Sequence, residues 1–250
     1  MILGKGGAHM KSQTRHKQPW CHADFWILLC ASLFLFVFAC TEVQNLLLDG
    51  GIRHSAVYRA VLLLLICALF YCGTYLYAER TGNKQSLCRL MLLFFALYLY
   101  LLVNLTLLDR SLGRGTHTAN VTSREKRAYY LERFVNFVPF QSIWEVYIQG
   151  FLHGYVNSYY MLLNLLGNLS ALTPFAFFLP YFFKAQRKWY VFLPTMLVTV
   201  SLIEAMQFLF MVGSCDVDDL ILNVGGAFLM FWLLRIPPIQ RTAQKLTGTK

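Results

Sequence analysis

Six long apolar runs follow one another along the chain, and they limit its possible folds more than any other feature. Their approximate positions are 24–41, 57–78, 87–108, 160–183, 190–212 and 217–234. A transmembrane helix needs roughly 20 mostly apolar residues, and each run is long enough to cross a bilayer. Only 14% of the 250 residues are charged, against roughly a quarter in soluble domains. The sequence therefore predicts an all-α polytopic membrane bundle of about six spans.

The same runs divide the chain into four parts. We expect a basic cytoplasmic tail at 1–23, two additional N-terminal transmembrane helices at 24–90, the main membrane domain at 91–235 and a second cytoplasmic tail at 236–250. The basic N-terminus and the apolar run behind it also match a secretory signal. However, that run is long for a signal core and the bulky Phe38 stands near the possible cleavage point, so we favour an uncleaved first span.

Basic residues predict the orientation of the spans. Lys and Arg gather in the N-terminal tail, the second loop, the fourth loop and the C-terminal tail, and cytoplasmic segments carry such an excess. Both termini should therefore be cytoplasmic. The long third loop, 109–159, is also basic and would lie outside, so a five-span arrangement is the alternative. Because the basic residues are divided among these segments, the net charge of +10 does not indicate nucleic-acid binding.

An amphipathic stripe runs through the second half of the third loop. Apolar residues recur there at three- and four-residue spacing: Phe140, Ile143, Trp144, Tyr147, Ile148 and Phe151. Such spacing indicates a helix with one apolar face. We expect this helix to lie in the outer membrane interface or to re-enter the bilayer shallowly. An ordinary helix packed on the bundle is the alternative.

Polar residues recur inside the last three runs, where an ionisable group in hydrocarbon is costly. They stand at helical spacing on one face of each run: Asn164 and Asn168; Ser201, Glu204 and Gln207; Asp216, Asp219 and Asn223. At about 1.5 Å of rise per residue, the three groups fall in one layer. We predict a polar cavity that opens toward the outer leaflet and binds a ligand. The alternative is that these side chains only hydrogen-bond one another and hold the helices together.

Three aspartates, Asp216, Asp218 and Asp219, stand at the start of the last run. Asp216 is placed to cap that helix, and acidic side chains in a first turn favour the helix dipole. We consider Arg133 a possible charge partner for one of the others. Binding of a hard divalent cation is a weaker alternative. We predict neither a metal nor a cofactor.

Small residues near the polar layer predict close helix packing. Gly167, Gly225 and Gly226 would let neighbouring backbones approach one another. Prolines at 174, 180 and 194 predict local kinks in the fourth and fifth spans, because proline removes a backbone donor.

Four motifs within about residues 98–234 together resemble those of the VanZ-like family. They are Asn136-Phe-Val-Pro-Phe140; Asn164-Leu-Leu-Gly167-Asn168 followed by Pro174-Phe175; Glu204-Ala-Met-Gln207; and Asp216-Val-Asp218-Asp219 leading to Asn223 and Gly225-Gly226. Members of that family often carry an arginine just ahead of the aspartates, and here Gly213-Ser214-Cys215 occupies that place.

The resemblance implies a role in the cell envelope of a Gram-positive-type bacterium. The family's name-giving member is linked to teicoplanin resistance, so antibiotic resistance is an expectation for this chain. We expect a multi-pass protein of the bacterial cytoplasmic membrane that is not an enzyme and binds a lipid-linked envelope precursor or a lipoglycopeptide, with membrane lipids as partners. The predicted binding cluster is Asn136, Asn164, Asn168, Glu204, Gln207, Asp216, Asp218, Asp219 and Asn223.

Two other functions stay open. The first is a membrane-embedded enzyme acting on a lipid head group or an envelope precursor, with Glu204 as general base. The second is a small transporter, for which a buried carboxylate is a familiar feature. The sequence specifies neither the ligand nor the oligomeric state.

Overall fold

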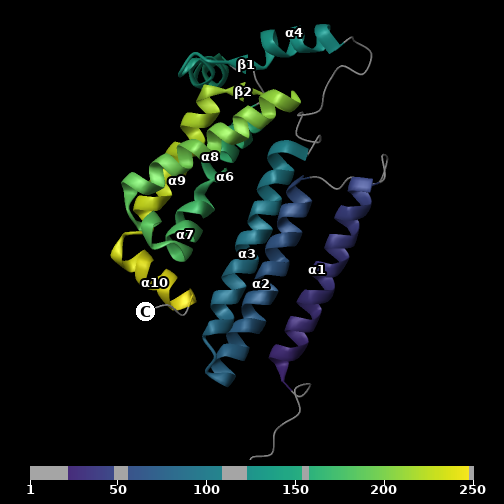
Figure 1. The fold of residues 1–250 in the computed structure, drawn as a ribbon, viewed down its shortest axis with the longest axis vertical. Helices are drawn as coiled ribbons and strands as arrows, with labels where there is room; N and C mark the ends of the chain where they lie inside the picture. The colour runs from purple at the N-terminus through teal and green to yellow at the C-terminus, as the bar shows by residue number, and fades with distance from the viewer. Residues whose placement is uncertain (1–21, 48–55, 109–122, 154–157, 248–250) are drawn as a thin grey trace, which may run out of the picture.

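The computed structural model is a bundle of long helices with a small cap at one end, formed by residues 123–153 and the strand at 215–216 (Figure 1). It describes residues 22–47, 56–108, 123–153 and 158–247. The first half contains α1 (Ala23–Leu47), α2 (Ala56–Thr81), α3 (Gln85–Val103), the π-helical turn η2 (Asn104–Leu108), α4 (Ser123–Arg133), β1 (Val135–Asn136), the π-helical segment η4 (Ile143–Gln149) and the short α-helix α5 (Gly150–His153). The second half contains α6 (Ser158–Ala171), α7 (Thr173–Phe182), the 3₁₀ turn η5 (Lys184–Arg187), α8 (Trp189–Phe210), β2 (Cys215–Asp216), α9 (Val217–Leu233) and α10 (Pro237–Thr247).

Among the residues that the structure describes, five segments are long and apolar enough to cross a membrane: Ala23–Gln44, Tyr58–Thr81, Gln85–Leu107, Asn164–Phe182 and Trp189–Phe210. The pair α9 and α10, bent by 88° at their junction, adds a sixth if it counts as one span. The predicted bundle of about six membrane helices is therefore confirmed. The fourth segment is broken between α6 and α7, where Pro174 falls in the first turn of α7 and needs no backbone donor.

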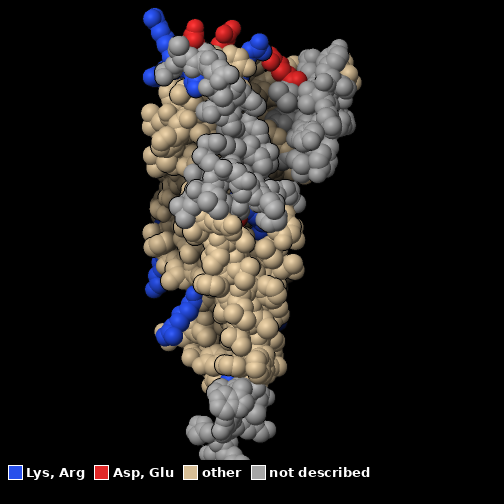
Figure 2. Space-filling view, turned by 90° about the vertical axis from the view of Figure 1, so that its right-hand side faces the viewer, with Lys and Arg blue, Asp and Glu red and all other residues tan. Residues whose placement is uncertain are grey.

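The surface of these segments carries apolar side chains, whereas several polar ones face inward. Leu33, Phe36 and Leu64 are more than half exposed. Among the buried residues are Asn168 and Gln207. Figure 2 shows acidic and basic side chains gathered at the upper end of the molecule, and below them a largely uncharged surface with a few Lys or Arg side chains along one edge. This arrangement suits a lipid environment, which solvates apolar but not polar groups.

The first two helices form an antiparallel hairpin that is tied at both ends by ion pairs. Near one end Arg80 contacts Asp24 at 2.7 Å, and near the other Arg59 contacts Glu42 at 3.3 Å. A Cβ on Gly73 would lie 2.8 Å from Cγ of Leu28, so α1 and α2 pack closely at that point. The hairpin continues into α3, which lies beside α2 in Figure 1.

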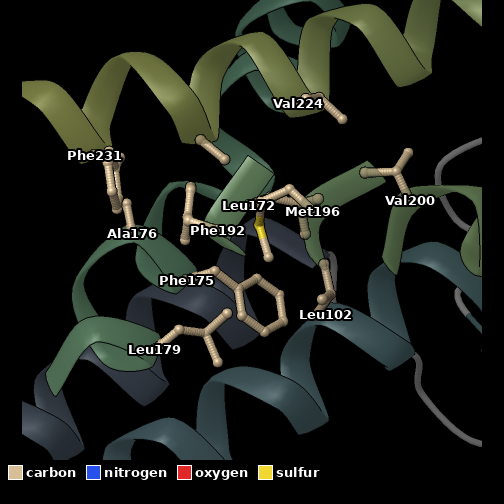
Figure 3. Close-up of a cluster of buried hydrophobic side chains, with 11 residues drawn as sticks. Leu102, Leu172, Phe175, Ala176, Leu179, Phe192, Met196, Val200, Val224 and Phe231 are labelled. Carbon is tan, nitrogen blue, oxygen red and sulfur yellow. The ribbon is translucent and has the colours of Figure 1, made fainter. Parts of the chain in front are cut away.

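A core of buried hydrophobic side chains joins α3 to the C-terminal helices (Figure 3). Phe192 of α8 stacks on Phe231 of α9 with ring centroids 4.4 Å apart, and both side chains are fully buried. The remaining buried members of this cluster are Leu102, Leu172, Phe175, Ala176, Leu179, Met196, Val200, Val224 and Ala227.

One of the three glycines expected at close helix contacts is found there. A Cβ on Gly226 would lie only 1.8 Å from the backbone oxygen of Leu169, so α6 and α9 touch at this residue. The same expectation is wrong for Gly167 and Gly225, where no atom of the described residues lies within 4 Å of an added Cβ. Gly225 is exposed because it faces away from α6, one position along the helix from Gly226.

The described part of the third loop, residues 123–153, forms most of the cap. Helix α4 leads into β1, which pairs in parallel with β2 so that Val135 lies opposite Cys215 and Asn136 opposite Asp216. The expected amphipathic segment is helical but mostly π-wound, as η4 followed by α5. Trp144, at 55%, is strongly exposed there, whereas the side chains of Tyr147 and Phe151 lie outside the described residues. Placement of this segment in the membrane interface stays a prediction.

Candidate functional site

The parallel pairing of β1 and β2 brings the Asn136 motif onto the start of α9. Nδ2 of Asn136 donates to Oδ1 of Asp216 at 3.2 Å, and the hydroxyl of Ser142 donates to Oδ2 of Asp216 at 2.5 Å. Asp216 also caps α9, because its Oδ1 accepts from the backbone N–H of Asp218 at 2.9 Å. The predicted capping role is confirmed, and both carboxylate oxygens of Asp216 are held by the protein.

Asp218 also holds the segment after Asn136 against the start of α9. Its side chain is 1% exposed, and its two oxygens accept the backbone N–H groups of Phe140 at 2.5 Å and Ile143 at 2.9 Å. Phe140 has a φ of 65°, in the left-handed region that side chains other than glycine seldom adopt. Asp218 therefore stabilises a strained turn. We call Asn136, Ser142, Asp216 and Asp218 the junction.

Next to the junction, a cavity of about 950 Å³ lies between α2, α3, η2 and the helices α6 to α9. Its polar lining includes Thr106, Asn164, Asn168, Ser170, Glu204, Gln207, Asp219 and Asn223. The rest of the wall is largely apolar and includes Ala60, Leu63, Leu64, Phe94, Leu101, Pro174 and Phe178. The cavity is thus an apolar chamber with a polar region, lined by both halves of the bundle.

The polar side chains of the cavity are held by one another and by the backbone. Asn168 donates through Nδ2 to Oδ1 of Asp219, and Asn223 donates to the backbone oxygen of Asp219 at 2.7 Å. Gln207, 5% exposed, donates through Nε2 to the backbone oxygen of Thr106 in η2 at 3.0 Å. These bonds connect α6 to α9 and α8 to η2, and so fix the positions of the lining groups.

Carboxylates make the end of the cavity near β2 electronegative. Burial raises the pKa of the Cys215 thiol, and the charges of Glu204, Asp216 and Asp219 raise it further. Burial also raises the pKa of Tyr130 to about 12, with smaller contributions from Cys215 and Glu204. Negative charge disfavours the ionised form of both groups.

The structure divides the predicted cluster in two. Asn164, Asn168, Glu204, Gln207, Asp219 and Asn223 line the cavity, as the single polar layer requires. Asn136, Asp216 and Asp218 belong to the junction instead. Arg133 is exposed at the end of α4, and no ion pair joins it to the aspartates among the residues described. Throughout the described ranges of the chain, no group of three or more His, Cys, Asp or Glu side chains could hold a metal ion.

Sequence reasoning missed two residues that contribute to the site, Ser142 and Thr106. Ser142 follows the Asn136 motif without a pattern of its own, and Thr106 takes part through its backbone oxygen, which no side-chain pattern reveals. It also missed that α2 lines the cavity through Ala60, Leu63 and Leu64. A helix with apolar residues on every side does not show which face lies against a neighbour.

Comparison with known proteins identifies the family of this chain. The family model VanZ/LLP1 matches residues 95–237, more than half of the chain, from within α3 to the first residue of α10. The match contains the junction and every polar cavity residue named above, whereas α1 and α2 precede it. No curated protein and no solved structure matches the chain. On the strength of the family match, this protein belongs to the VanZ-like family.

Proposed function

We propose that this chain is a non-enzymatic protein of the bacterial cytoplasmic membrane that binds an amphiphile with an apolar tail. The ligand is a lipid-linked envelope component or the acyl part of a lipoglycopeptide such as teicoplanin. The observation that carries the proposal is the cavity of about 950 Å³. This volume lies at the upper end of the roughly 300–1,000 Å³ of small-molecule sites, which combine apolar walls with a few polar groups.

The shape of the cavity suits a tail that lies along the bilayer normal. Its lining on α3 and η2 extends from Phe94 to Thr106, a rise of roughly 18 Å at about 1.5 Å per residue. That is more than half of a hydrocarbon core about 30 Å thick. Asp219, in the first turn of α9, lies toward the cap, and Phe94, in the middle of α3, lies toward the opposite end.

The orientation of the protein follows from its basic segments. In Figure 1 α1 begins at the end of the bundle where α10 lies, and the cap lies at the other end. We propose that α10 and the start of α1 face the cytoplasm, in keeping with the basic terminal segments. The polar region of the cavity then opens near the outer leaflet, where lipid-linked precursors and lipoglycopeptides meet the membrane.

Drug susceptibility tests the proposal. Minimum inhibitory concentrations of teicoplanin and vancomycin are measured in a sensitive Gram-positive host that expresses wild type, Glu204→Gln or Asn168→Ala at matched levels. Glu132→Gln, on the exposed surface of α4, is the control for a neutralised carboxylate. We expect wild type and the control to raise teicoplanin tolerance more than vancomycin tolerance, and the two cavity variants to lose the gain. Equal tolerance to both drugs, or no change with wild type, contradicts the proposal.

An enzyme acting on a lipid head group is the second candidate. The observation that favours it is the presence of two carboxylates, Glu204 of α8 and Asp219 of α9, in the lining of one cavity, where a general base could act on a bound head group. Mass spectrometry of lipid extracts from the same strains separates the two functions. A new lipid product that appears with wild type and disappears with Glu204→Gln favours the enzyme.

A further inference from the structure

The polar lining of the cavity presents hydrogen-bond acceptors and negative charge. Glu204 and Asp219 contribute carboxylates, which accept hydrogen bonds and do not donate them when ionised. In the described part of the chain, no lysine, arginine or histidine lines the cavity. A negatively charged group that enters would therefore meet like charge and no cation.

Three amide side chains reinforce this preference, because each already donates one hydrogen bond within the protein. Asn168 donates to the Asp219 carboxylate, Asn223 to the Asp219 backbone oxygen, and Gln207 to the backbone oxygen of Thr106. Each amide thus uses at least one N–H inside the protein and keeps an oxygen that can accept. A ligand made only of acceptors, such as a phosphate ester, finds few donors here.

The electrostatic field around the cavity has the same sign. The charges of Glu204 and Asp219 act on Cys215 in β2, and that of Glu204 also acts on Tyr130 in α4, beyond the end of the spans. In a membrane interior with a low dielectric constant, such charges are screened far less than in water. A cationic group gains most from this field.

We infer that the polar part of the ligand is a protonated amine and not a phosphate. This inference rests on the proposed function, since it takes the cavity to be the binding site of an amphiphile, and it names the chemical class of the head group. The ammonium lies among the oxygens of Glu204, Asp219 and the neighbouring amides, while the tail lies along the apolar wall. A lipid-linked pyrophosphate would have to keep its phosphates outside the cavity.

A competition experiment between two matched probes tests the inference. Purified protein is mixed with equal amounts of tetradecylamine and tetradecyl phosphate, and the bound molecules are counted by native mass spectrometry. The probes share one tail, so their ratio reports on the head group alone. Because the net charge of the chain is +10, non-specific binding would favour the phosphate.

We expect wild type to bind the amine at least tenfold more than the phosphate. The preference should fall at least tenfold in Glu204→Gln and in Asp219→Asn, and it should persist in the control Glu132→Gln. Since Asp219 also accepts from Asn168, the folding of Asp219→Asn is checked by size-exclusion chromatography, and Glu204→Gln provides the result that does not depend on this bond.

A variant on the apolar wall separates failure of the inference from failure of the proposed function. Ala60→Trp places a large ring in the chamber from α2 and should abolish binding of both probes. If wild type binds the phosphate as well as the amine and Ala60→Trp loses both, the cavity binds tails and the amine inference is overturned. If Ala60→Trp binds both probes as well as wild type does, the cavity is not the binding site and the proposed function is overturned as well.

Discussion

Asp218 and Asp219 are neighbours in the chain, yet they belong to different regions with different physical tasks. Asp218 points into the junction, where its carboxylate is buried and bonded to two backbone N–H groups. Asp219 points into the cavity and is half-buried. Successive residues of a helix project about 100° apart, so one step along α9 separates a carboxylate held in the junction from one that lines the cavity. A motif of adjacent acids therefore does not by itself define a site.

The largest expected effect comes from removing the buried carboxylate of Asp218. In Asp218→Ala two backbone donors lose the buried carboxylate that accepts from them, and the strained turn at Phe140 loses its support. We expect a loss of about 2–4 kcal/mol in the free energy of unfolding. Thermal unfolding of the protein in detergent measures it. A melting temperature equal to that of wild type would show that the junction is not structural.

The next largest effect concerns the close contact between α6 and α9 at Gly226. Gly226→Ala places a methyl group against the backbone of Leu169 and should cost about 1–3 kcal/mol. Gly225→Ala is the matched control, because an added Cβ there meets nothing within 4 Å. The two melting temperatures are compared side by side. Equal values for both variants would contradict the close approach of the helices.

A smaller effect tests whether the junction acts as one network. Asn136→Ala and Ser142→Ala each remove one bond to Asp216, and the two side chains also bond each other at 3.0 Å. Each variant should cost about 1 kcal/mol. The double variant should depart from the sum by about 0.5 kcal/mol or more, because the groups share a partner. Strict additivity in denaturant unfolding would show independent contacts.

The smallest effect reports on the electrostatics of the cavity through a neighbouring thiol. The chain has 7 cysteines, so Cys215 is studied with the other six replaced by alanine. Carboxylate charge raises the pKa of this thiol and so reduces its thiolate fraction at pH 8. Glu204→Gln removes part of that charge, lowers the pKa and should speed alkylation of Cys215 about two- to threefold, by the link between pKa and thiolate fraction. An unchanged rate would show that Glu204 does not influence the region.

Much of the candidate site could be anticipated from spacing alone. Asn168, Glu204 and Asn223 lie on three different runs at similar depth, and the helix rise was enough to place them in one layer. The division of the aspartates could not be anticipated, since it depends on the parallel pairing of β1 with β2. That pairing joins segments about 80 residues apart, and two-residue strands leave no readable pattern.

What the sequence determined by itself was the class of the fold and its family. Continuous apolar runs of about 20 residues satisfy their backbone in a bilayer as helices, whereas strands of membrane barrels are about 10 residues long and alternate apolar with polar residues. Composition and run length were therefore sufficient for the class, and the four motifs for the family. Only the tertiary structure decided that α2 lines the cavity through Ala60, Leu63 and Leu64, and that Asp219 rather than Asp218 faces it. The reason is physical: the face that a helix turns toward its neighbours depends on their packing, and a helix that is apolar on every side does not specify that face.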